Sequence, residues 1–72
     1  MKLPCISGRQ CVKALEKIGF HEVSQRGSHI VLCRDNPYAQ VIVPNHDNLD
    51  RGTLRAIIRH VNLTVAEFTE LL

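Results

Sequence analysis

Apolar residues recur at helical spacing near the start of the chain. Ser7 and Gln10 have the spacing of a capping box, in which each side chain bonds the other residue's backbone N–H. An apolar stripe follows, formed by Cys11, Leu15 and Ile18. Gly19 comes next, and glycine is a common helix stop. The pattern predicts a first helix that Ser7 caps and Gly19 ends.

The pattern in the middle of the chain predicts β-strands. Residues 20–25 alternate weakly, whereas residues 28–33 and 39–43 are rich in β-branched and aliphatic side chains. A polar turn at residues 34–38 separates the last two segments, and Pro44 ends the third. We therefore expect three short strands joined by tight connections.

Helical spacing returns in the last third of the chain. Asp50 caps a stripe formed by Leu54, Ile57, Ile58 and Val61, and Asn62 ends it. Thr64 and Glu67 form a second capping box before a short last helix. The order α-β-β-β-α-α predicts an α+β fold, with a three-stranded antiparallel meander covered by helices on one face. The 72 residues are expected to form one domain, 1–72.

The strands hold more apolar side chains than one covered face needs. Two sets are expected on opposite faces. One is Ile30, Leu32 and Ile42; the other is Val31, Val41 and Val43. Whichever set is left uncovered is either a scatter of exposed aliphatics, which is common, or a face that docks on a partner protein.

Composition narrows the class of protein. The net charge is +2, and the few aromatic residues disfavour base-stacking platforms of the RRM or OB type. The odd number of cysteines, without a C-x-x-C pair or a recognisable signal peptide, predicts reduced thiols in a cytoplasmic protein. The histidines lack metal-ligand spacing, and no apolar run reaches membrane-spanning length. We expect no metal, no cofactor and no membrane contact.

The run Gln25-Arg26-Gly27-Ser28-His29 is the strongest candidate for chemistry. It places an imidazole at the start of a stiff strand, beside a basic residue, a hydroxyl and a glycine that lets the backbone turn. An ordinary imidazole titrates at about 6.5, so a histidine held there suits proton transfer near neutral pH. A structural or surface histidine remains the alternative explanation.

Two rows of basic residues repeat every four positions. Arg9, Lys13 and Lys17 share one side of the first helix, and Arg51, Arg55 and Arg59 share one side of the second. Each row either tracks phosphates or is a solvated face. A basic domain with this element order and few aromatic residues suits binding to a nucleic-acid backbone by shape, as double-stranded-RNA-binding domains do.

Several segments together resemble a known family. They are residues 2–4, 7–9, 15–20, 25–29, 43–46, 50–59 and 63–68, which span nearly the whole chain. In these segments the chain resembles the HicA family, the toxins of HicAB toxin–antitoxin systems. The turn at residues 34–38 departs from the His-Pro-Asp-Gly-like turn usual in that family.

The resemblance implies a fold like that of double-stranded-RNA-binding domains, cleavage of mRNA, and neutralisation by a HicB antitoxin. The family's catalytic histidine corresponds to His29. In the mechanism we expect, His29 acts as a metal-independent general base, and Arg26, Gly27 and Ser28 stabilise the phosphate.

Further residues are expected to support this site. Arg51, Arg55 and Lys13 would hold the RNA backbone, and His46 would supply the second proton transfer if the fold brings it close. The alternative function is a non-catalytic RNA-binding or protein-interaction module.

Overall fold

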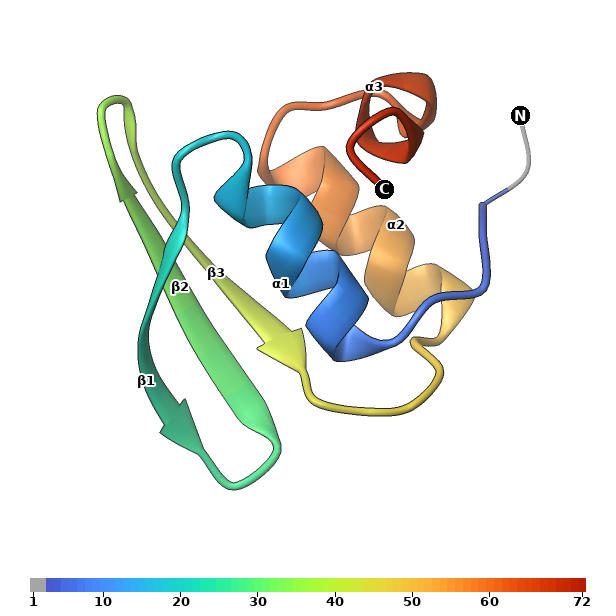
Figure 1. The fold of residues 1–72 in the computed structure, drawn as a ribbon, viewed down its shortest axis with the longest axis horizontal. Coiled ribbons are helices and arrows are strands. Elements are labelled where there is room, and N and C mark those ends of the chain that lie inside the picture. Colours follow the sequence, from blue (N-terminus) through green and yellow to red (C-terminus); the bar gives the residue numbers. More distant parts are fainter. Residues whose placement is uncertain (1–2) are drawn as a thin grey trace.

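Three antiparallel strands form a sheet, the two longer helices lie against one of its faces, and the short last helix packs against the second helix (Figure 1). The structure is a computed structural model that describes residues 3–72. Its elements are α1 (Gly8–Glu16), β1 (His21–Arg26), β2 (His29–Asp35), β3 (Tyr38–Pro44), α2 (Arg51–His60) and α3 (Val65–Thr69). The strand order is β1-β2-β3. This arrangement confirms the α+β fold, similar to double-stranded-RNA-binding domains, that the sequence predicts.

The predicted caps begin all three helices. Ser7 and Gln10 form the complete capping box of α1, and Thr64 and Glu67 form that of α3. The Asp50 carboxylate accepts hydrogen bonds from the backbone N–H groups of Gly52 and Thr53, in the first turn of α2. The α-helical part of α1 ends at Glu16, earlier than expected, and the chain then turns to Gly19, which has a φ of 99°.

The pairing of β2 with β3 corrects the predicted faces of the sheet. Ile30 pairs with Val43, Leu32 with Val41, and Val31 with Ile42. Directly paired residues point to the same face of a sheet, so grouping Ile42 with Ile30 and Leu32 was wrong. The expected turn of residues 34–38 is only Asn36-Pro37, with Asp35 and Tyr38 already paired. The length of this turn sets the register, and strand alternation alone does not reveal it.

The corrected register explains where the core lies. Ile30, Leu32, Val41 and Val43 are buried beneath the helices. They pack with fully buried side chains of all three helices, among them Leu15, Leu54 and Phe68. On the other face, which we call the open face, Val31 is half-buried and Ile42 is 51% exposed. The helices therefore leave one apolar pair uncovered, Val31 and Ile42.

The three cysteines are free thiols in different environments. Cys5 is exposed, Cys33 is half-buried and Cys11 is fully buried on the inner side of α1. Burial raises the pKa of the Cys11 thiol to about 12, because the core disfavours the thiolate. Within residues 3–72, no helix is long and apolar enough to cross a membrane.

Candidate functional site

His29 and Arg26 are neighbours at one end of the sheet. His29 is the first residue of β2, and Arg26, the last residue of β1, is its direct partner across the two strands. Such partners have Cα atoms about 4.5–5.5 Å apart and side chains on the same face. Both residues are exposed. The structure therefore brings together the predicted histidine and the predicted phosphate-binding arginine on the open face.

A two-residue turn joins Arg26 to His29. Gly27 has a φ of 59°, and a positive φ at the first turn position is typical of type II′ hairpins. The Ser28 carbonyl accepts a hydrogen bond of 2.6 Å from the backbone N–H of Asn45, which follows β3. The Gly27 carbonyl accepts one of 3.1 Å from Gln25 Nε2. The turn is thus held from two sides, which fixes the backbone that carries His29.

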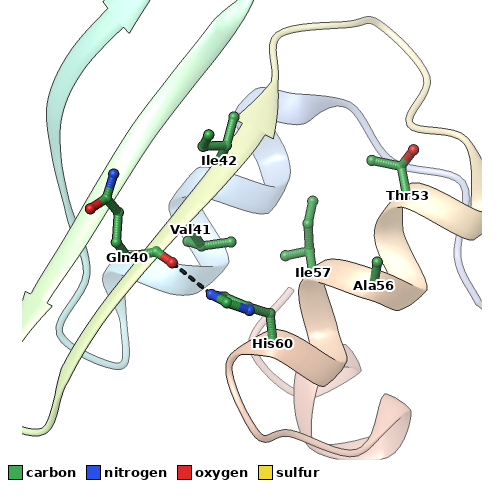
Figure 2. Close-up of a pocket in the computed structure, with 7 residues that line it drawn as sticks. All are labelled: Gln40, Val41, Ile42, Thr53, Ala56, Ile57 and His60. Carbon is green, nitrogen blue, oxygen red and sulfur yellow. Dashed lines mark hydrogen bonds between the residues drawn. The ribbon is translucent and has the colours of Figure 1, made fainter.

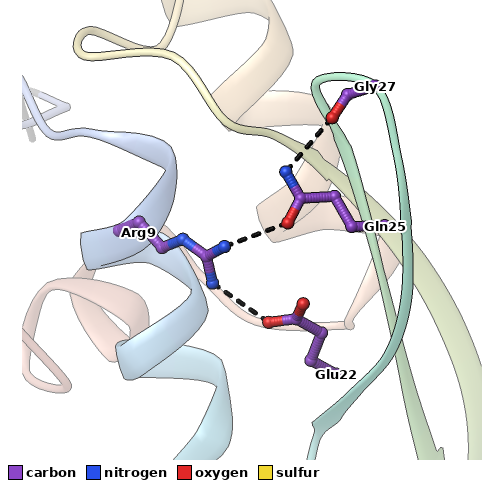
Figure 3. A network of polar contacts seen from close by, with 4 residues as sticks. All are labelled: Arg9, Glu22, Gln25 and Gly27. Atoms are coloured by element: carbon purple, nitrogen blue, oxygen red, sulfur yellow. Dashed lines mark hydrogen bonds and ion pairs between the residues drawn. The ribbon is translucent and has the colours of Figure 1, made fainter.

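A network of polar contacts joins this hairpin to α1 (Figure 3). Arg9 Nη1 lies 3.0 Å from Glu22 Oε1, and Arg9 Nη2 donates a hydrogen bond of 3.1 Å to Gln25 Oε1. Gln25 in turn bonds Gly27. Arg9, which the sequence offered as a phosphate-tracking residue, instead positions the hairpin against α1. Its helical spacing gave no sign of these partners on β1.

The loop after β3 lies at the same end of the sheet as the hairpin of β1 and β2 (Figure 1), and His46 belongs to this loop. Pro44 is the partner of His29 across β2 and β3, and His46 follows two residues later. The His46 carbonyl accepts a hydrogen bond of 2.8 Å from the backbone N–H of Gly8, at the start of α1. A Cβ at Gly8 would lie 2.0 Å from the Pro44 carbonyl oxygen, so only glycine allows this approach. Sequence reasoning missed that role of Gly8.

The other two histidines lie elsewhere. His21 pairs with Cys33 at the opposite end of β1. His60, at the end of α2, has its Nε2 2.7 Å from the Gln40 carbonyl oxygen. Of the other three histidines, His46 is therefore the one whose loop directly follows the strand partner of His29.

The basic residues fall into two groups. Arg9, Lys17 and Arg34 have protein partners: Lys17 Nζ donates to the Leu71 carbonyl, and Arg34 donates to the Pro37 carbonyl and lies 4.7 Å from the Phe20 ring centroid. A second group is exposed, without a side-chain hydrogen bond or ion pair to another residue of the described part of the chain. This group consists of Lys13, Arg26, Arg51, Arg55 and Arg59.

A groove of about 540 Å³ lies between β3 and α2 (Figure 2). Val41, Ile42, Ala56 and Ile57 are among the residues that line it. The contact between His60 Nε2 and the Gln40 carbonyl oxygen joins α2 to β3 at the groove. Among residues 3–72, no Lys, Arg, Asp or Glu side chain lines it, and it does not include His29. The groove and the acid/base residues are thus separate features. Within residues 3–72, no three His, Cys, Asp or Glu side chains are grouped so that they could hold a metal ion.

Comparison with known families identifies the family of this chain. A family model described as the HicA toxin of bacterial toxin–antitoxin systems matches residues 8–63. The chain belongs to the HicA toxin family. The match begins at the first residue of α1 and extends three residues beyond α2, so it contains the hairpin and both basic rows. Membership makes this HicA protein the toxin of a toxin–antitoxin system, with an antitoxin as its partner. The comparison with curated proteins gives no match.

Proposed function

We propose that this HicA-family toxin is a metal-independent endoribonuclease that cleaves mRNA in the cytoplasm, with His29 as the general acid/base. The observation that carries the proposal is the direct pairing of Arg26 with His29 beside a held two-residue turn. This pairing supports placing an imidazole and a guanidinium against one phosphodiester. Residues 1–72 would act as one HicA-like domain.

RNA supplies its own nucleophile, so the protein needs only to transfer protons and to stabilise the charge on the phosphate. His29 takes the proton of a ribose 2′-hydroxyl, whose oxygen forms a bond to the adjacent phosphorus. Arg26, with the Gly27 and Ser28 amides or the Ser28 hydroxyl, stabilises the charge on the phosphorane. The bond to the 5′-oxygen then breaks, and that oxygen takes a proton. The products are a 2′,3′-cyclic phosphate and a 5′-hydroxyl.

The proton for the leaving oxygen needs a second group. His46 is the candidate, because it follows the strand partner of His29 by two residues and its loop is tied to both Ser28 and Gly8. The RNA backbone would be held by Arg51, Arg55 and Lys13, whose charges lack protein partners in the described residues. Arg51 is the first residue of α2, where the helix dipole disfavours a cation, so its charge does not serve the helix.

The test is RNA cleavage by purified protein in the presence of EDTA. We expect His29→Ala to lower the rate by roughly two to four orders of magnitude, the usual weight of a general acid/base, without loss of folding, because the side chain is exposed. His21→Ala, an exposed histidine at the other end of β1, is the matched control. His46→Ala should also reduce the rate. Near wild-type cleavage by His29→Ala would contradict the assignment.

The same assay tests the alternative function. A non-catalytic RNA-binding or protein-interaction module would leave RNA intact at every protein concentration, and an RNA-binding module would still retain it. The pairing of Arg26 with His29 favours the enzyme, since neither side chain packs in the core.

A HicB-type antitoxin is the partner we propose, and its docking surface is the open face. Val31 and Ile42 form a directly paired apolar centre there, on the same face as Arg26 and His29. A partner with an apolar contact and an acidic rim would fit this centre and the basic residues around it. Docking there would cover His29, so inhibition would follow from occlusion.

Hydrogen exchange on the free toxin and on the complex tests this surface. Strands β2 and β3 should gain protection in the complex, with little change in α1 and α2. Protection confined to residues 64–72, with β2 and β3 unchanged, would exclude docking on the open face.

A further inference from the structure

A second groove lies between the end of α2 and the start of α3. It has a volume of about 450 Å³. Ile58, which is buried, and Leu63 and Val65, which are half-buried, give it apolar walls. Arg55, Arg59 and Asn62 are exposed and contribute its polar lining. No acidic residue of the described part of the chain lines the groove. It therefore combines two cationic side chains with apolar surface.

The charges of this groove are available to a ligand. Neither the Arg55 nor the Arg59 guanidinium has a side-chain partner among residues 3–72. The C-terminal end of a helix is the negative pole of its dipole. In α2, however, three of the last carbonyls already accept backbone hydrogen bonds. Those of Ile57, Ile58 and Arg59 accept hydrogen bonds from the N–H groups of residues 61, 63 and 62. The groove thus favours an anion.

The groove is joined to the hairpin end by the basic row of α2. Arg51 begins the helix beside the loop that follows β3, and Arg55 and Arg59 follow at intervals of four residues. Because an α-helix rises 1.5 Å per residue, Arg59 lies about 12 Å along the helix from Arg51. An RNA chain that follows this row from the start of α2 would reach the groove at Arg55 and Arg59.

We propose that the groove between α2 and α3 is a second RNA subsite, which binds an unpaired nucleotide flanking the cleaved bond. Arg55 and Arg59 bind its phosphates, and its base lies against the apolar wall of Leu63 and Val65. Guanidinium groups both pair with phosphates and stack on bases, which suits them to this place. The inference rests on the proposed ribonuclease function and deepens it, since it makes single-stranded RNA the preferred substrate.

Two substitutions test the subsite without disturbing the core. Arg59→Gln removes one positive charge. Asn62→Asp adds a negative charge in nearly the same shape, and aspartate, like asparagine, tolerates the φ of 61° found at this position. Asn62→Gly is the matched control, because it keeps the backbone conformation and adds no charge. Arg34→Gln is the control for losing a cation elsewhere, since Arg34 already has protein partners.

Binding is measured with 2′-O-methyl oligonucleotides, which lack the nucleophile and stay intact. For an oligonucleotide of about 12 residues, we expect Arg59→Gln to weaken binding about three- to tenfold and to lower the salt slope by about 0.7, the loss of one phosphate contact on a single strand. Asn62→Asp should weaken binding at least as much. An oligonucleotide of about three residues that spans only the hairpin end should bind all variants alike.

Several outcomes would overturn the subsite. Unchanged binding of the long oligonucleotide is one, and equal losses for long and short oligonucleotides is another. A loss that follows a lowered melting temperature would make Arg59 structural. If Arg59→Gln weakened only antitoxin binding, the groove would belong to a protein interface. If His29-dependent cleavage held throughout, only the subsite would fail; if the wild-type protein neither bound nor cut RNA, the proposed function itself would fail.

Discussion

The two longer helices carry basic residues at the same spacing, but the fold uses the two rows differently. On α1, Arg9 pairs with Glu22 and Gln25, and Lys17, the C-cap of this helix, donates to the Leu71 carbonyl. On α2, none of the three arginines has a side-chain partner within residues 3–72. The row on α1 therefore mostly holds elements together, whereas the row on α2 is available to a ligand.

The elements beside the two rows explain the difference. α1 lies beside β1, whose side chains are all exposed and whose Glu22 and Gln25 are paired with the buried Leu32 and Ile30. That pairing turns both acceptors toward the helices, within reach of Arg9. On α2, Arg55 and Arg59 border the groove toward α3, and no acidic side chain of residues 3–72 lines that groove. Equal spacing on two helices thus leads to different roles because the elements beside the rows differ in acceptors.

The largest effect on stability is expected at Gly8, the first residue of α1. Gly8→Ala on α1 would place a Cβ 2.0 Å from the Pro44 carbonyl oxygen, where backbone must move. We expect a loss of about 3 kcal/mol or more in the free energy of unfolding, measured by urea denaturation. Gly52→Ala on α2 is the matched control.

In Gly52→Ala the new Cβ would meet only the Asp50 carboxylate, at 3.1 Å. Alanine also favours a helix over glycine by about 1 kcal/mol, so the net change should stay within about 1 kcal/mol of zero. Equal losses in the two variants would show that α1 is not held at Pro44 as the structure has it.

The next largest effect is on the pH dependence of stability, and it is expected from Cys11 on the buried side of α1. The pKa of Cys11 is raised to about 12 by burial, so between about pH 9 and 12 the folded protein keeps a proton that the unfolded chain loses. Stability from this thiol is therefore complete below about pH 9, and it falls above that by up to about 1.4 kcal/mol per pH unit. Denaturation at several pH values measures this slope.

Cys11→Ala should be less stable near pH 7, because it leaves a small cavity, but its stability should fall less steeply above pH 9. Cys5→Ala, at an exposed position, should keep the wild-type slope. Identical slopes in wild type and Cys11→Ala would mean that the thiol is accessible to solvent in the folded state.

Local sequence patterns were sufficient to predict the elements. Both capping boxes and the Asp50 cap depend on residues within three positions of each other, and all three caps are present. The faces of the sheet could not be predicted in the same way. They depend on the register of β2 and β3, which the two-residue turn at Asn36-Pro37 sets.

The candidate site likewise has one part that depends on neighbouring residues and another that depends on residues far apart in the sequence. Arg26 and His29 are adjacent because only two residues separate them, and this distance could be predicted from a hairpin. The place of His46 depends on contacts of its loop with Ser28 and Gly8, far away in the sequence. The partners of Arg9 lie 13 and 16 residues away on another element, so helical spacing carried no information about them.

The smallest expected effects separate the two basic rows directly. Arg9→Gln removes an ion pair between side chains that are 50% and 35% exposed, so it should cost less than about 1 kcal/mol of stability. It should leave RNA affinity nearly unchanged.

The double variant Arg51→Gln/Arg55→Gln should do the reverse. Its stability should match the wild type, but its RNA affinity should fall about tenfold over many sequences, with a flatter salt dependence. Lys13→Gln, the α1 cation without a side-chain partner in residues 3–72, should resemble the α2 variant more weakly. Filter binding at several salt concentrations, with melting temperatures alongside, measures both quantities. If Arg9→Gln lost as much RNA affinity as the double variant, the two rows would bind RNA together and the difference between the helices would disappear.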